Sequence, residues 1–351
     1  MPDLPPLARF GDRVATGLLD VTSDPAALDS AGFWAVCADY EGRLTCARFA
    51  DVREEPVPAP VPGRWPGPDA GDWASSLDRA AYTAGVRRIR EHIATGEVYQ
   101  VNLCRVLSAP VAPGADVDAL AAVLARGNPA PYAGTIRLPE HGVEIATASP
   151  ELFLRRAGRT VESGPIKGTA RTEAELLAKD YAENVMIVDL VRNDLGRVCV
   201  TGSVTVPDLC AVEKHPGLVH LVSTVRGELR PDAGWPDLLA AAFPAGSITG
   251  APKSSALRII DALETAPRGP YCGGIGWVDA DRGVGELAVG IRTFWIERSS
   301  DGAAVLRFGA GAGITWDSDP EGEWRETELK AARLLAVASG EYQDLVDLGP
   351  Q

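Results

Sequence analysis

Several long segments of the chain repeat their apolar residues with the spacing of a helix. Residues 76–95 place Leu77, Ala81, Ile89 and Ile93 on one face, and Gly96 follows. This pattern predicts a helix that buries one face and ends at the glycine. The same criterion predicts helices at 117–126, 173–195, 236–242, 252–265 and 320–339.

Between these helices lie short segments whose apolar residues alternate or run together, which is typical of strands. They cover residues 33–36, 44–46, 98–106, 144–148, 152–156, 160–162, 220–229, 287–296 and 305–308. Strands in consecutive runs, with helices gathered between the runs, favour an α+β protein over a doubly wound parallel sheet.

One segment, residues 56–72, is too rich in proline and glycine for a regular element and is expected to be a surface linker. We therefore divide the chain into an N-terminal strand segment with its linker, residues 1–72, and a main unit, residues 73–342. A chain of 351 residues can bury a large core, and both parts are expected to belong to one globule.

The charge and the cysteines narrow the class of protein. A net charge of −14 argues against a nucleic-acid partner, which requires a basic face. No apolar run approaches the ~18 residues of a membrane helix, so no membrane partner is expected. The six cysteines lack metal-ligand spacing and are typical of buried thiols in a reducing compartment, which indicates a cytoplasmic protein.

The segment Pro165-Ile166-Lys167-Gly168-Thr169 sets one lysine between a proline and a glycine, residues that shape the local backbone. We expect a tight turn here, ahead of the helix at 173–195. Taken alone, Lys167 is best interpreted as a solvated turn lysine, since most lysines are exposed. An amine aimed into a cleft and desolvated would instead have a lowered pKa and could act as a nucleophile or base.

Three glutamates stand in segments suited to chemistry. Glu151 follows an apolar run, and burial there would raise its pKa and suit a general acid. Glu183 and Glu326 lie on separate predicted helices and could share a hard cation such as Mg²⁺. Other interpretations stay open: a surface turn for Glu151, and an exposed i,i+4 pair with Lys330 for Glu326.

Arg292 interrupts the alternating segment 287–296, where its same-side neighbours are small or apolar. An unpaired charge there costs free energy, so we expect Arg292 to bind a carboxylate. The glycines between Gly309 and Gly313 would let backbone N–H groups approach an anion closely. His220 opens a predicted strand, and a lone strand histidine is more often structural than catalytic.

Taken together, these residues resemble the chorismate-utilising enzymes. The matching motifs follow in the same order at residues 97–105, 149–152, 165–169, 180–197, 220–224, 246–264, 271–277, 290–293 and 309–330. The resemblance covers nearly everything from residue 75 to residue 340. It implies an α+β sandwich of two large antiparallel sheets, with helices outside and chorismate bound with Mg²⁺ in a central cleft.

The resemblance also implies a role for each matching residue. Lys167 would add to C2 of chorismate, Glu151 would protonate the departing C4 hydroxyl, and His220 would sit near that hydroxyl. Glu183 and Glu326 would hold Mg²⁺. The implied substrate-binding residues are Tyr271, Arg292, Gly311, Gly313, Lys330, Ser247, Thr249 and Gly250.

Two positions discriminate between activities within the family. Isochorismate and salicylate synthases carry a water-activating lysine where this chain has Gln100, and anthranilate synthases have alanine where Lys167 stands. Lys167 with Gln100 is therefore most similar to component I of aminodeoxychorismate synthases. This implies amination of chorismate at C4, on the way to 4-aminobenzoate and then folate or a secondary metabolite. The ammonia would come from a separate glutamine amidotransferase subunit or be supplied free.

Two other functions remain open at this point. One is amination at C2, as in component I of anthranilate or 2-amino-2-deoxyisochorismate synthases, for which Lys167 would be dispensable. The other is a non-catalytic chorismate-binding partner of an amidotransferase. The full set of Glu151, Lys167, Glu183 and Glu326 argues against such a partner, since binding alone does not need all four.

Overall fold

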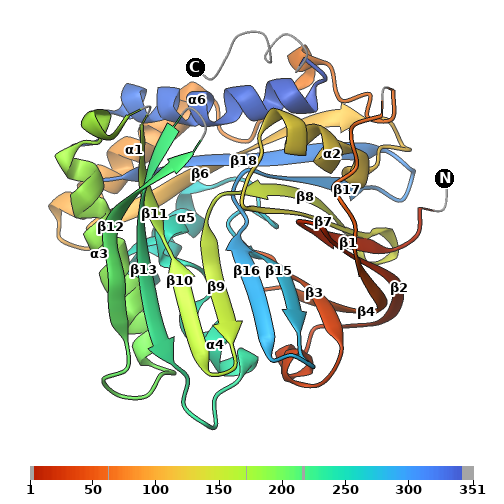
Figure 1. Cartoon of the computed structure of the whole chain (residues 1–351). Coiled ribbons are helices and arrows are strands. Elements are labelled where there is room, and N and C mark those ends of the chain that lie inside the picture. Colours follow the sequence, from red (N-terminus) through yellow and green to blue (C-terminus); the bar gives the residue numbers. More distant parts are fainter. Residues whose placement is uncertain (1–3, 62, 171, 216–217, 342–351) are drawn as a thin grey trace.

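Eighteen strands and six α-helices make up the part of the chain that the computed structural model describes, which is residues 4–61, 63–170, 172–215 and 218–341. All strand pairs are antiparallel. Together with the helices they confirm the predicted α+β class (Figure 1).

The strands form one continuous ladder that doubles back on itself. In order of neighbours it runs β12 (Thr205–His215), β13 (Leu218–Glu228), β10 (Thr160–Gly164), β9 (Leu152–Ala157), β16 (Val284–Val289), β15 (Gly274–Asp279), β3 (Phe33–Ala38), β4 (Leu44–Glu54), β2 (Arg13–Thr22), β1 (Leu7–Phe10), β7 (Tyr132–Leu138), β8 (Val143–Ser149), β17 (Thr293–Arg298), β18 (Ala304–Ile314) and β6 (Gln100–Val111). Three short strands complete it: β11 (Ile166–Ala170) pairs with β13, while β5 (Ala74–Ser75) and β14 (Gly250–Ala251) pair with β6.

The two halves of this ladder form the two layers of the fold. In Figure 1, β6 and β18 run across the upper part of the molecule, at a steep angle to β9, β16 and β13 below them. Ile136 and Ile145 from one half share a core cluster with Val36 and Ile275 from the other. The predicted sandwich is therefore present, and its two layers are joined through β4, β2, β1 and β7.

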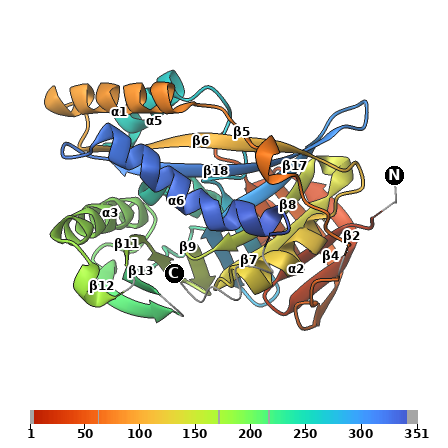
Figure 2. The ribbon, with the colours of Figure 1, turned by 90° about the horizontal axis from the view of Figure 1, so that it is seen from above.

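The helices lie where the apolar spacing predicted them: α1 (Arg79–Ala94), α2 (Val117–Gly127), α3 (Ala178–Gly196), α4 (Trp235–Ala242), α5 (Lys253–Leu263) and α6 (Pro320–Ala338). Figure 2 shows α1, α5 and α6 along β6 and β18, and α1 contacts α6 through Tyr82 and Trp324, whose ring centroids lie 5.7 Å apart. Side-chain caps fix the starts of α1 and α6. Asp78 accepts a hydrogen bond from the N–H of Ala81, and Asp319 accepts one from the N–H of Gly322, both at 2.8 Å.

Two sequence predictions were wrong in their local structure. The predicted strand at 287–296 is two strands, β16 and β17, which pair with different neighbours. The chain breaks between them at Arg292, whose φ of 52° lies in the left-handed region and ends the extended run. The predicted turn at 165–169 is strand β11, and Gly168 (φ 76°) forms a bulge in its pairing with β13.

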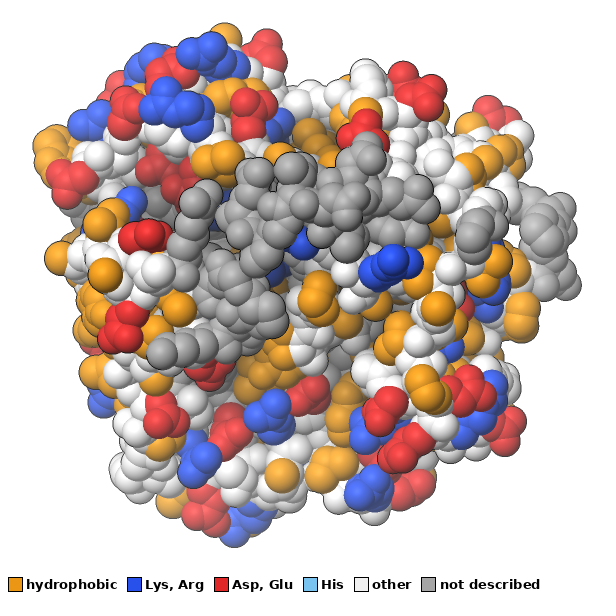
Figure 3. Space-filling model, turned by 45° about the horizontal axis from the view of Figure 1, so that its top comes forward, with side chains coloured by type: hydrophobic (Ala, Val, Ile, Leu, Met, Phe, Trp, Pro, Cys, Tyr) orange, Lys and Arg blue, Asp and Glu red, His pale blue; other side chains and the backbone are white. Residues whose placement is uncertain are grey.

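The N-terminal segment is part of the sheet. Its strands β1 and β3 pair with β7 and β15, which lie in the segment from residue 73 onward. In the described residues, no helix has the length and apolar character needed to span a membrane. Acidic and basic side chains are interspersed across much of the face drawn in Figure 3.

Candidate active site

Strand β11 holds Lys167 in place through its pairing with β13. Lys167 lies opposite Leu221 in this ladder, and the bulge follows directly at Gly168. A Cβ at position 168 would come within 2.8 Å of the Cβ of Asp180 on α3, so only glycine fits both the turn of the backbone and the packing. The bulge thus allows α3 to pack close to the lysine.

Lys167 is half-buried, and its amine is held by a backbone carbonyl. Its Nζ donates to the carbonyl of Ser247 at 3.3 Å. Burial lowers the pKa of Lys167, and the charge of Lys330 acts in the same direction, while Glu183, Glu151 and Glu326 oppose the shift. A lowered pKa increases the fraction of neutral amine, which is the nucleophilic form.

Gln100 lies beside this amine. A Cβ at Gly313 would be 2.2 Å from the Nε2 of Gln100 and 3.7 Å from the Nζ of Lys167, so both side chains approach the bare backbone of β18. The amide of Gln100 donates to the Oε2 of Glu183 at 3.5 Å. The two positions that discriminate activities within the family therefore meet in one place.

Glu151 stands at the junction of β8 and β9 and is 4% exposed. Its backbone N–H donates to the Oγ of Ser149 at 3.2 Å, and that hydroxyl donates to the carbonyl of Val289 at 2.6 Å. Burial raises the pKa of Glu151 from 4.5 to about 7, against the opposing effects of the Ser247 hydroxyl and the Lys167 amine. Such a carboxyl can hold a proton near neutral pH and donate it.

Two carboxylates, Glu183 on α3 and Glu326 on α6, interact electrostatically with the Lys167 amine. Burial raises the pKa of Glu183, and the negative charges of Asp180 and Glu326 add to the rise. Burial also acts to raise the pKa of Glu326, but the charge and hydrogen bond of Lys330, with the charges of Lys179 and Lys167, together lower it. Carboxylates close enough to repel each other, with oxygen donors only, fit a hard cation such as Mg²⁺.

A third carboxylate, Glu323, adds to this charge, and sequence reasoning missed it. It lies one turn before Glu326 and accepts from the Oγ of Ser318 at 2.6 Å. Burial raises its pKa, and Glu326 contributes to the rise. Within the described ranges no three metal-binding side chains converge on one point, so a cation here would need oxygens from a ligand or water as well.

Lys330 does form the i,i+4 pair with Glu326, at 2.7 Å, and both side chains are about half exposed. The alternative prediction of an exposed i,i+4 pair between Glu326 and Lys330 is therefore correct for this contact. The same amine also donates to the carbonyl of Gly311 at 3.1 Å, which ties α6 to the glycine-rich strand β18. The pair thus lies beside the part of β18 that Gln100 and Lys167 approach.

Arg292 is the clearest anion-binding candidate. Burial lowers the pKa of its guanidinium, and among the described side chains no carboxylate pairs with it, although most of the chain's other arginines have such a partner. A mostly buried cation without a counter-ion is costly, and a bound carboxylate would remove that cost.

Tyr271 is 4% exposed and packs against the neighbouring strand β18, where a Cβ at Gly309 would collide with its ring. Its hydroxyl accepts from the Sγ of Cys104 at 3.7 Å. Gly311 lies opposite Cys104 in the β6–β18 ladder. The expected residues Tyr271, Gly311 and Gly313 are thus brought to one stretch of β18.

Of the remaining expected residues, Ser247, Thr249 and Gly250 lie around the start of β14, whereas His220 lies on β13. Ser247 offers its carbonyl to Lys167, whereas the buried Thr249 hydroxyl donates to the carbonyl of Ala245 at 3.0 Å and is turned toward its own backbone. Gly250 takes a φ of 146°, and a Cβ there would meet the carbonyl of Gln100. His220 is 3% exposed and lies opposite Thr169 in the β11–β13 ladder.

Arg268 is a supporting residue that sequence reasoning also missed. It is 1% exposed, forms a 2.7 Å ion pair with Glu264, and donates to the carbonyls of Ile248 and Asn102 at 2.9 and 2.8 Å. It therefore fixes the segment that carries Ser247 and Thr249. Only the i,i+4 spacing of Glu264 and Arg268 could have indicated the pair.

Comparison with known proteins identifies the family. The sequence pattern of the chorismate binding enzymes matches residues 35–336, so the chain belongs to this family. It is 42% identical over 305 residues to component 1 of anthranilate synthase from Streptomyces coelicolor, covering 82% of this chain and 58% of that protein. It is 37% identical over 322 residues to component 1 of aminodeoxychorismate synthase from Salmonella typhimurium, covering 86% and 68%.

A solved structure agrees with the fold. Component I of anthranilate synthase from Streptococcus pneumoniae superimposes with a TM-score of 0.73 at 26% identity, covering 87% of this chain and 81% of that one. The chain spans about 58% of the length of the Streptomyces relative. The relatives include enzymes of both names, and all of them agree with membership of the chorismate binding family.

Proposed function

We propose that the chain is component I of an aminodeoxychorismate synthase, which replaces the C4 hydroxyl of chorismate by an amino group. One observation carries the proposal: the half-buried amine of Lys167 lies beside Gln100 and interacts with the Glu151 carboxyl, whose pKa is raised to about 7. This combination of lysine and glutamine is the one that the resemblance connects with amination at C4.

In the first step Lys167 and Glu151 act together. The neutral amine of Lys167 adds to C2 of the ring, the two ring double bonds shift toward C4, and the C4–O bond breaks. Glu151 gives its proton to the departing hydroxyl, which leaves as water, and becomes a carboxylate. The lowered pKa of the lysine and the raised pKa of the glutamate both favour this starting state.

The two carboxylates of chorismate would be held by two different groups of residues. Glu183 and Glu326 would hold Mg²⁺, which supplies positive charge for the ring carboxylate when it is bound. Arg292 and Tyr271 would take the enolpyruvyl carboxylate, with Lys330 at the side of the ring. These cations would bind a dianion in a protein whose net charge is −14.

Ammonia would come from a partner. The relatives' names describe them as components, which supports a separate amidotransferase subunit. Five of the six cysteines are buried, which is unlike an accessible glutaminase nucleophile. We expect free ammonium to replace the partner in a purified system.

A second candidate, amination at C2, is favoured by the 42% identity to an anthranilate synthase component. In that reaction ammonia would attack C2 directly, and Lys167 would carry no bond to the substrate. The two reactions therefore differ in their products and in their dependence on one side chain.

The deciding experiment supplies the purified chain with chorismate, Mg²⁺ and ammonium, and identifies the product after adding a lyase that releases 4-aminobenzoate. Formation of 4-aminobenzoate supports C4 amination, whereas anthranilate would reject it. Lys167→Ala and the isosteric Lys167→Met should both abolish turnover and the covalent lysine adduct seen by intact mass. Arg88→Ala, on the exposed surface of α1, serves as the control and should behave as the wild type.

A further inference from the structure

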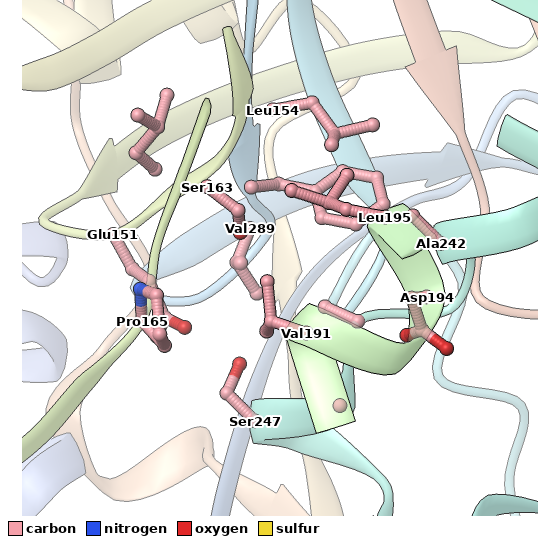
Figure 4. A pocket seen from close by; sticks show the side chains of 14 residues that line it. Glu151, Leu154, Ser163, Pro165, Val191, Asp194, Leu195, Ala242, Ser247 and Val289 are labelled. Atoms are coloured by element: carbon pink, nitrogen blue, oxygen red, sulfur yellow. The ribbon is translucent and has the colours of Figure 1, made fainter. Parts of the chain in front are cut away.

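A small cavity adjoins Glu151. It offers about 10 Å³ to the centre of a water-sized molecule, which is room for about one such molecule. Glu151, Pro165 and Ser247 lie at one end in Figure 4, and Asp194 lies at the other. Lys167 does not line it, but Glu151, which does, interacts electrostatically with the Lys167 amine.

Most of the wall between the two ends is apolar. Val191 and Leu195 of α3 face Leu154 and Val289 of the sheet, with Ala242 from the end of α4 beside them. An apolar wall disfavours an ion but admits a small neutral molecule. The cavity is therefore unsuited to ammonium and far too small for the chorismate ring.

An ion pair closes the far end. The Nζ of Lys253 contacts the Oδ2 of Asp194 at 2.7 Å and donates to the carbonyl of Ala242 at 3.3 Å. Both side chains are mostly buried, with 9% of Asp194 and 20% of Lys253 exposed. The far end thus approaches the surface between the last turn of α3 and the first turn of α5.

We propose that this cavity holds the ammonia molecule that attacks the ring, so that the nitrogen reaches C4 from the side of Glu151. The inference rests on the proposed function. That reaction needs a second substrate, ammonia, which has one heavy atom and must reach C4, the carbon whose hydroxyl has just been protonated by Glu151. The cavity has the matching size, polarity and position.

The second step then balances without any further reagent. The lone pair of ammonia forms the bond to C4, the two ring double bonds shift back, and the C2–N bond to Lys167 breaks with its electron pair returning to the lysine. The new C4 ammonium gives one proton to the carboxylate of Glu151. Lysine leaves as the neutral amine and glutamate regains its proton, so both return to their starting states.

The test fills the cavity from its apolar wall. Ala242→Val adds two methyl groups to a residue that lines the cavity. Ala241→Val is the matched control, because Ala241 lies next to it on α4, is 5% exposed against 6%, and does not line the cavity. Val191→Leu fills the space from α3 and serves if Ala242→Val does not fold, with circular dichroism and thermal unfolding as the check of folding.

We expect the cavity-filling variants to raise the KM for ammonium by about tenfold or more, with the KM for chorismate and the rate of lysine adduct formation without ammonium unchanged. Ala241→Val should match the wild type. An unchanged KM for ammonium would overturn the inference, as would a parallel rise of the KM for chorismate.

The identity of the product is read separately and tests the proposed function. Amination at C2 with a raised KM for ammonium would reject the C4 proposal and keep the cavity as an ammonia site. Amination at C4 with an unchanged KM for ammonium would support the C4 proposal and reject the cavity as an ammonia site. A wild type that does not use ammonium at all would reject both.

Discussion

The buried carboxyl of Glu151 should make the stability of the protein depend on pH in a direction opposite to that of most carboxylates. Its pKa is raised from 4.5 to about 7 in the folded protein, mainly by burial. The folded state therefore binds a proton that the unfolded state has released, and stability must fall as pH rises through this interval.

The magnitude follows from the size of the pKa difference. Each pH unit between the two pKa values corresponds to about 1.4 kcal/mol. The cost of ionising Glu151 is below about 1 kcal/mol at pH 5 and reaches about 3 kcal/mol at pH 8. Glu151→Gln removes this titrating group. The free energy of unfolding of the variant, relative to that of the wild type, should therefore be about 2.5 kcal/mol higher at pH 8 than at pH 5.

The assay is urea unfolding of both proteins at pH 5, 6, 7 and 8 in metal-free buffer, followed by tryptophan fluorescence. Glu173→Gln, which removes an exposed carboxylate, is the control and should follow the wild type at every pH. A difference between wild type and Glu151→Gln that stays constant from pH 5 to pH 8 would refute the reasoning, because it would show that Glu151 does not titrate in this range.

Three further changes test other parts of the site. Gly313→Ala should lower kcat/KM by about a hundredfold, because the added methyl group displaces Gln100, and an unaltered value would contradict the close approach. Arg268→Ala should lower the free energy of unfolding by about 3–5 kcal/mol in urea, since it leaves Glu264 buried and unpaired; a loss below 1 kcal/mol would show that water replaces the pair. Glu183→Gln should raise the Mg²⁺ concentration for half-maximal activity by about tenfold or more, and an identical Mg²⁺ titration would exclude it as a ligand.

The elements that the sequence predicted well are those with a strong local period. The helices α1 and α6 show one apolar stripe each, and their bounds differ from the prediction by few residues. The strands β7, β12 and β15 were missed, and β1 and β2 were not located within the predicted N-terminal strand segment, since their apolar pattern is interrupted. In β2, for example, most residues after Ala15 are exposed or half-buried, so no alternation is visible along the chain.

The site shows the same division between local and distant information. Proline and glycine around Lys167 predicted a turn, because the sequence alone does not reveal the partner strand that turns Gly168 into a bulge. The roles assigned to Glu151, Glu183 and Glu326 came from the resemblance, and the fold brings all three near enough to Lys167 to affect its pKa. Arg268 was missed because its function lies in contacts with Ile248 and Asn102, which are distant in sequence.

The pairing of β6 with β18 has a consequence for synthesis on the ribosome. It joins residues 100–111 to residues 304–314, and α6 follows only after that. Such remote contacts form late, after nearly the whole polypeptide has emerged. We therefore expect Lys167, which approaches Gly313 of β18, to stay solvated and cationic during synthesis until β18 has paired with β6.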